Sequence, residues 1–259
     1  MMFFRRWAKN RWIRQIVFFT ALLVAWQVFA WVGPLPDYVF PSPLSVVQTL
    51  MRGFQNGTFV IGIAASMQRI LIGFGISAVV GMALGLAMGR IRLLDETVGS
   101  LVLGLQALPS ICWLPLALLW FGLSETAILF VVVMGALLSI TLATEAGVKN
   151  TPPLYLRAAR NLGARGWRLY ALVILPAALP AIITGMKLGW SFAWRSLMAG
   201  ELLYVSLGLG QLLNAGRELN DMSQVIAVML VIIAIGLVVD RLVFAPVESR
   251  VRERWGLQG

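Results

Sequence analysis

Long apolar segments constrain this chain more than any other feature of its sequence. A helix that crosses the hydrocarbon core of a membrane, about 30 Å thick, needs about 20 mostly apolar residues. Six segments meet this requirement: 15–33, 66–89, 98–121, 126–144, 172–197 and 224–244. Charged residues make up only 12% of the chain, against about 25% in ordinary soluble domains. The sequence therefore predicts an all-α integral membrane protein with about six transmembrane helices.

The basic residues fall mostly on one side of this arrangement. The chain has 21 lysines and arginines, and such residues concentrate in cytoplasmic loops. One set of connecting segments carries most of them: Arg5, Arg6, Lys9, Arg11, Arg14, Arg90, Arg92, Lys149, Arg157, Arg160, Arg165, Arg168, Arg241, Arg250, Arg252 and Arg254. The opposite segments carry only Arg52 and Arg217. We therefore expect residues 1–14, 145–171 and 246–259 in the cytoplasm, with both termini on that side.

Several functions are excluded by what the sequence lacks. It has no histidine, one cysteine (Cys112), and no G-x-x-x-x-G-K-[ST] phosphate-binding loop. We therefore expect neither an enzyme nor a cofactor or metal bound by this chain. The net charge of +10 follows from the loop topology and does not indicate nucleic acid as a partner. Without internal repeats or Gly/Ser linkers, residues 1–259 are interpreted as a single membrane domain.

Two further segments have helical patterns. The stretch "SPLSVVQTLMRGF" places Leu44, Val47, Leu50 and Met51 on one face, which predicts an amphipathic helix at the outer membrane surface. Gly81, Gly85 and Gly89 recur every four residues in the second span. Small residues at this spacing allow close packing of membrane helices, either within the chain or between two copies.

The loop "LRAARNLGARGWRLYALVILP", residues 156–176, interrupts the apolar pattern with four arginines. Pro152 and Pro153 favour a helix start, and Gly163 favours a helix end with positive φ. A second short helix is predicted to begin near Arg165 and run to Pro176. Two interpretations are open: a solvated basic connector, or a compact projection that docks into another protein.

The same loop resembles the signature of permease subunits of bacterial ABC importers. That signature is E-A-A, three residues, Gly, nine residues, then I-x-L-P. Here Arg157-Ala158-Ala159, Gly163 and Val173-Ile174-Leu175-Pro176 match its spacing, with Arg157 where the family usually has glutamate. The segments "LPSICWLPLALLWFG", "PSPLSVVQTL" and "WRSLMAGELL" are similar to the permeases for nitrate, sulfonates, taurine and bicarbonate.

The resemblance implies a type I ABC importer transmembrane domain in a bacterial inner membrane. Two copies, expected to be identical, would form the pathway for a small anionic solute. Partner ATPase subunits would bind ATP and Mg, and an extracytoplasmic binding protein would deliver the solute. The residues implied in ATPase docking are Arg157, Ala158, Ala159, Arg160, Gly163, Arg165, Leu175 and Pro176.

The candidate pathway residues are Pro109, Pro115, Lys187, Arg195 and Glu201. The two prolines are expected to bend the third span. Ionisable residues within a membrane are costly and often functional, so Arg195 could attract an anion. Alternatively, Arg195 pairs with Glu201, while Lys187 pairs elsewhere or extends to the interface. Arg69 is expected to extend to the outer interface.

Two rival functions remain open at this stage. An ion-coupled secondary transporter or channel would act without an ATPase, but such proteins tend to have inverted repeats and broken helices. A membrane scaffold without transport activity has only the lack of catalytic residues in its favour.

Overall fold

A computed structural model describes residues 11–36, 38–203 and 207–254, and every regular element in these ranges is a helix. Contacts divide the chain into two compact units, residues 1–61 with 212–232 and residues 62–211 with 233–259. The all-α prediction is confirmed. The single-domain interpretation of residues 1–259 stays a prediction.

Five helical segments of the described chain are long and apolar enough to cross a membrane: Ile13–Val32, Thr58–Arg90, Glu125–Lys149, Gly166–Leu203 and Met222–Val251. A sixth span results if the bent pair Arg92–Gln106 and Ser110–Phe121 is counted as one. These segments overlap all six apolar stretches expected from the sequence. The difference lies in the third stretch, which forms two arms instead of one continuous helix.

The first unit contains α2 (Arg11–Val32) and α3 (Pro43–Gln55). Ser42 caps α3 by accepting a hydrogen bond from the Ser45 amide at 3.3 Å, and Pro43 occupies the first turn. Leu44, Val47 and Met51 of α3 are exposed and apolar. The helix predicted for this segment is confirmed, and its position at the outer membrane surface stays a prediction.

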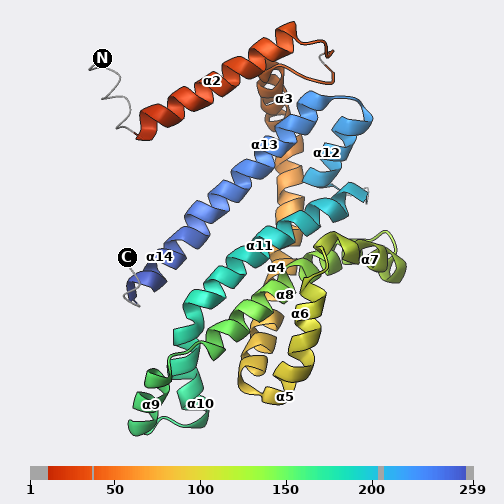
Figure 1. Cartoon of the computed structure of the whole chain (residues 1–259). Helices are drawn as coiled ribbons and strands as arrows, with labels where there is room; N and C mark the ends of the chain where they lie inside the picture. Colours follow the sequence, from red (N-terminus) through yellow and green to blue (C-terminus); the bar gives the residue numbers. More distant parts are fainter. Residues whose placement is uncertain (1–10, 37, 204–206, 255–259) are drawn as a thin grey trace, which may run out of the picture. The chain divides into compact units, whose positions relative to one another are not determined.

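The core of the second unit lies where α8 (Glu125–Lys149) and α11 (Leu175–Leu203) run side by side (Figure 1). Ile128, Val132 and Ile140 of α8 are buried together with Ala193 and Leu197 of α11. Small residues permit this close approach: a Cβ on Gly189 would lie 2.8 Å from the Ile140 side chain. In a bilayer such packing replaces the hydrophobic effect as the main attraction between helices.

The glycine series of α4 (Thr58–Arg90) packs against α8 of the same chain. A Cβ on Gly81 would lie 3.1 Å from the Ile140 side chain, and a Cβ on Gly85 or Gly89 would collide with Thr144 or Val148. The sequence left open whether these glycines pack within the chain or between two copies. In the structure they pack against a helix of the same chain. The glycines thus hold α4 on the face of α8 beside the core.

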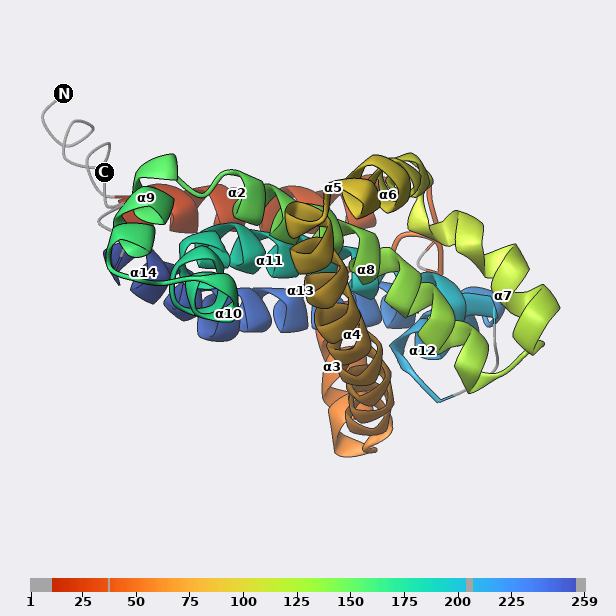
Figure 2. The same ribbon diagram turned by 90° about the horizontal axis from the view of Figure 1, so that it is seen from below.

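The third predicted span is broken at Pro109. It consists of α5 (Arg92–Leu94), the π-helical η1 (Asp95–Gly99) and α6 (Ser100–Gln106), followed by the 3₁₀ turn η2 (Ser110–Trp113) and α7 (Leu114–Phe121). The two arms meet at 103°, and Figure 2 shows α7 turning away from α6. Pro109 lies in the break, as predicted. Pro115 lies in the first turn of α7, where proline fits a helix without bending it.

After α11 follow α12 (Leu209–Glu218), α13 (Met222–Val239), η4 (Asp240–Phe244) and α14 (Ala245–Arg254). In the second unit, α14 packs against α11.

Substitution of Gly85 should destabilise the protein through the α4–α8 contact. A Cβ at Gly85 would collide with the backbone oxygen of Thr141 and lie 2.6 Å from Thr144 Cβ, and overpacking of this kind costs about 1–3 kcal/mol. We expect Gly85→Ala to lower the midpoint of thermal unfolding in detergent. Gly75→Ala is the matched control, because a Cβ on Gly75 of the same helix meets nothing within 4 Å. Equal midpoints for both variants would contradict the packing role.

Candidate functional site

The basic loop folds into a compact projection, residues 153–169, at the end of α8 and α11 (Figure 1). It contains α9 (Pro153–Asn161) and α10 (Gly166–Leu169). The first predicted short helix is confirmed, whereas the second does not end at Pro176 but continues as one helical segment to Leu203. The Ala164 amide donates to the Ala159 oxygen at 2.9 Å, and the Gly163 amide donates to the Arg160 oxygen at 3.0 Å. These two bonds and a φ of +85° at Gly163 form a Schellman motif. The glycine corner predicted from the sequence is therefore present.

The base of the projection is tied to the long helices. The Tyr170 hydroxyl donates a 2.5 Å hydrogen bond to the Leu86 oxygen of α4, and Arg90 lies over the Tyr170 ring at 5.2 Å. Leu175 packs in one cluster with Val148 of α8. Pro176 follows the π-helical turn η3 (Tyr170–Ile174) inside one continuous helical segment. The projection is thus attached to the helices at whose ends it lies.

The outer surface of the projection is both basic and apolar. Arg157, Arg160, Arg165 and Arg168 are exposed, and the sequence between residues 150 and 171 contains no acidic residue. Leu162 and Trp167 are 89% and 74% exposed. Ala158 is exposed, whereas Ala159 is buried. Large exposed apolar side chains beside arginines are typical of a surface that binds another protein.

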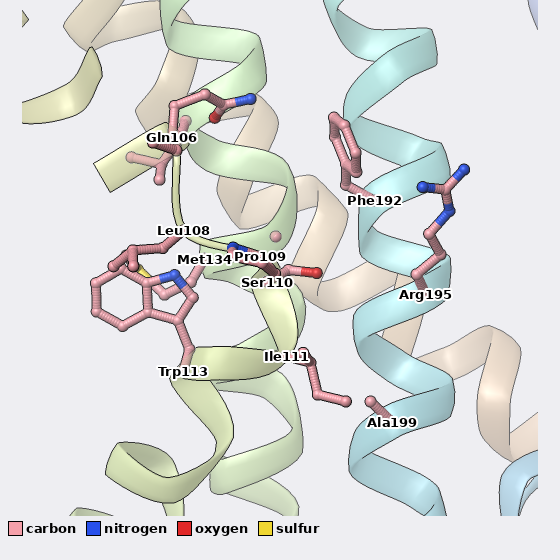
Figure 3. A pocket seen from close by; sticks show the side chains of 13 residues that line it. Gln106, Leu108, Pro109, Ser110, Ile111, Trp113, Met134, Phe192, Arg195 and Ala199 are labelled. Carbon is pink, nitrogen blue, oxygen red and sulfur yellow. The ribbon is translucent and has the colours of Figure 1, made fainter. Parts of the chain in front are cut away.

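A cavity of about 440 Å³ opens where the third span is broken (Figure 3). Its walls come from the break, from α8 and from α11: Gln106, Ala107, Leu108, Pro109, Ser110, Ile111, Trp113, Met134, Gly135, Leu138, Phe192, Arg195 and Ala199. Pro109 and Arg195, which the sequence placed in the pathway, meet here. Pro115, Lys187 and Glu201 do not line it.

Glu201 is bound by Arg69 and not by Arg195. The Arg69 guanidinium lies 2.7 Å from Glu201 Oε1 and 2.6 Å from Glu125 Oε2, and it also donates to the Leu207 oxygen at 2.7 Å. Arg69 thus pairs with two carboxylates, and its extension to the outer membrane interface stays a prediction. The alternative that pairs Arg195 with Glu201 is wrong, because Arg69 occupies the Glu201 carboxylate.

The Glu201 carboxylate is fully enclosed by hydrogen-bond donors. Its oxygens lie 2.8 Å from Ser66 Oγ and 2.9 Å from the Gly210 amide, and its side chain is 0% exposed. Ser66 Oγ in turn accepts from the Leu209 amide at 2.9 Å. A buried charge is tolerated when it is paired and hydrogen-bonded. This cluster therefore fastens the start of α12 to α4 and α11.

Lys187 pairs elsewhere, as one interpretation of the sequence proposed. Its Nζ lies 2.6 Å from Asp240 Oδ1 and 3.9 Å from Glu248 Oε2. The pair joins α11 to η4 and α14.

Sequence reasoning missed Gln106, Ser110 and Ser66. Gln106 donates a 3.0 Å hydrogen bond to Ser139 of α8, which orients it at the cavity. Single polar residues in apolar spans were the available signal, but nothing in their spacing says which cavity or charge they approach.

Comparisons with known proteins agree with these features. The model of the family "binding-protein-dependent transport system inner membrane component" matches residues 77–252. A putative ABC transporter permease of Methanocaldococcus jannaschii is 35% identical over 85% of this chain and 84% of its own. The taurine transport system permease of Escherichia coli is 29% identical over 91% and 88%. The nitrate import permease of a Synechocystis species is 30% identical over 92% and 89%.

A solved structure shares the fold at low sequence identity. A chain of the MetNI methionine ABC transporter in an inward-facing conformation matches with a TM-score of 0.62 and 19% identity, covering 74% of this chain and 95% of that chain. The second half of the fold-class prediction, a type I ABC importer transmembrane domain, is confirmed.

Glu201→Gln should destabilise the protein far more than Glu125→Gln, although both remove a carboxylate that binds Arg69. An amide in place of the Glu201 carboxylate would leave one acceptor oxygen for Arg69, Ser66 and the Gly210 amide, and breaking a buried ion pair costs about 3–5 kcal/mol. The Glu125 side chain is 51% exposed, and exposed pairs contribute about 0–1 kcal/mol. Thermal unfolding of both purified variants in one detergent measures the difference. Similar losses would show that Glu201 is not the central member of the cluster.

Proposed function

This chain belongs to the family of binding-protein-dependent transport system inner membrane components, and from this we propose that it is the permease of an ATP-driven importer for a small anionic solute. The observation that carries the proposal is the projection 153–169 with its glycine corner, its arginines and its exposed Leu162 and Trp167. Permeases need such a surface because another subunit hydrolyses ATP.

In this proposal the projection docks into a cleft of an ABC ATPase subunit. Arg157, Ala158, Arg160, Gly163 and Arg165 are exposed and would contact the partner. Ala159, Leu175 and Pro176 would act indirectly, by keeping the projection on its helices. Arginine at position 157 brings positive charge where relatives usually carry glutamate, so the partner surface is expected to be acidic there.

For transport, a movement of the projection has to be transmitted to the solute pathway. Packed helices move as rigid elements and transmit displacements between sites. Both α8 and α11 line the cavity, and both end near the projection. ATP and Mg would be bound by the partner, with no cofactor on this chain. ATP-driven closure of two ATPase subunits would thus draw the projections together and open the pathway outward.

The remaining assignments follow from the same proposal. Two copies of the chain form the pathway as a homodimer in a bacterial inner membrane, with both termini and the projection in the cytoplasm. An extracytoplasmic binding protein delivers the solute. Relatives are named for nitrate and taurine. Nitrate is a planar oxyanion and taurine carries a sulfonate, and this supports a solute with an oxyanion group.

Affinity purification of the tagged protein from its native membranes in mild detergent tests the proposal. We expect an ATPase with a phosphate-binding loop at about one per permease. A homo-oligomer that transports without any ATPase would refute the docking role and favour a secondary transporter or channel.

The glycine corner offers a sharper test of docking. At Gly163 φ is +85°, while a Cβ there would meet no atom within 4 Å, so backbone conformation and not space limits substitution. Gly163→Val should distort the corner, since β-branched residues disfavour positive φ, and uncouple ATP hydrolysis from uptake while membrane insertion persists. Gly163→Asn is the matched control, because asparagine tolerates this region. Normal coupled uptake by Gly163→Val would contradict the role of the corner.

A further inference from the structure

Three basic side chains lie well inside the long helices α4 and α11, and two of them have carboxylate partners. Arg69 binds Glu125 and Glu201, and Lys187 binds Asp240. The third, Arg195, makes no ion pair with any residue that the structure describes. Its guanidinium instead lies 5.6 Å from the centre of the Phe192 ring. Arg195 is thus the one of the three whose charge is not balanced within the described chain.

An unbalanced cation within a membrane-spanning helix is costly unless it faces water or a counter-charge. The carboxylate nearest in sequence, Glu201, is already saturated by Arg69, Ser66 and Gly210. Arg195 is exposed and lines the cavity. The structure therefore leaves the guanidinium available to a ligand inside the cavity.

The cavity wall offers donors and no negative charge. Its 13 lining residues include no aspartate or glutamate. Figure 3 shows Gln106 and Ser110 of the broken span across the cavity from Arg195 of α11. Gln106 is oriented by its bond to Ser139, and a primary amide has a second N–H to donate. The Ser110 hydroxyl lies on the same wall and can also donate into the cavity.

We propose that Arg195, Ser110 and Gln106 form a transit subsite for the oxyanion group of the solute, a proposal that rests on the function proposed above. A guanidinium presents a planar fork of N–H groups that matches two oxygens of a nitrate or sulfonate. Phe192 supports the guanidinium through a cation–π contact. A cavity of about 440 Å³ lies within the range of small-molecule sites.

The broken span is what creates this arrangement. The two arms meet at 103°, and the cavity lies at their junction, where Gln106 ends one arm and Ser110 begins the other. One arginine with two neutral donors is a weak site, which suits a solute that must leave again.

Anion-selective fluorescence quenching tests the subsite without any transport. Trp113 lines the cavity, so the difference between the protein and its Trp113→Phe variant isolates the Trp113 signal. The probes are iodide, an anionic quencher, and acrylamide, a neutral one, applied to the permease in its complex in lipid nanodiscs. We expect Arg195→Gln to reduce iodide quenching of Trp113 by roughly two- to fivefold, as for loss of a local positive potential, with acrylamide quenching unchanged.

Competition and control variants complete this experiment. Nitrate should compete with iodide in the parent protein and not in Arg195→Gln. Arg195→Lys should retain iodide quenching, whereas Arg217→Gln, at an exposed arginine that does not line the cavity, should change nothing. Unchanged iodide quenching in Arg195→Gln, or no competition by nitrate, would overturn the subsite.

Uptake by proteoliposomes with ATPase and binding protein separates the two proposals. If the parent complex takes up nitrate or taurine, Arg195→Gln should lower uptake by about tenfold or more, as for loss of a charge-assisted contact. Arg195→Lys should recover only part of it because the planar fork is lost. Equal uptake by the parent and Arg195→Gln would overturn the subsite alone. Absence of ATP-driven uptake in the parent would instead count against the proposed function, while the quenching result would still decide the subsite.

Discussion

The close approach of α8 and α11 supports everything else in the second unit. Glycine and alanine on both helices let their backbones come together: a Cβ on Gly147 would lie 2.9 Å from that of Ala181, and one on Gly185 would collide with Ala143. Helices in lipid gain little from the hydrophobic effect, so this packing is the principal attraction between them. The pair lines the cavity and also reaches the projection 153–169, so that it connects the two candidate sites.

Ion pairing separates the basic residues of α4 and α11 into two that stabilise the fold and one that is left for a ligand. Arg69 forms ion pairs with Glu201 and Glu125, and the resulting cluster fastens the chain around Leu209 to α4. Lys187 forms an ion pair with Asp240. These pairs are structural, since each neutralises a charge that would otherwise be costly in the membrane. Arg195 remains, beside a cavity whose other polar groups are donors. Because Arg69 occupies the Glu201 carboxylate, Arg195 is left available to an anion.

The projection and the broken span illustrate two uses of glycine and proline. Gly163 adopts a positive φ and closes α9 with two hydrogen bonds, so that a short basic helix ends at a defined corner. Pro109 interrupts an apolar segment that is long enough to span the membrane, and the chain resumes at an angle. In both places a local backbone constraint builds a concave or protruding surface that an uninterrupted helix cannot offer.

The sequence by itself determined the helical class, the positions of the apolar spans, the glycine corner and a departure from straight helix at Pro109. Each depends on local properties: hydropathy over about 20 residues, or the φ preferences of single residues. Only the tertiary structure decided that α4 glycines pack on α8, that Glu201 binds Arg69, and that Gln106 and Ser110 face Arg195. These contacts join residues far apart in the chain, and several partners of equal charge compete for each. Spatial arrangement selects among them, and no pattern along the sequence encodes that choice.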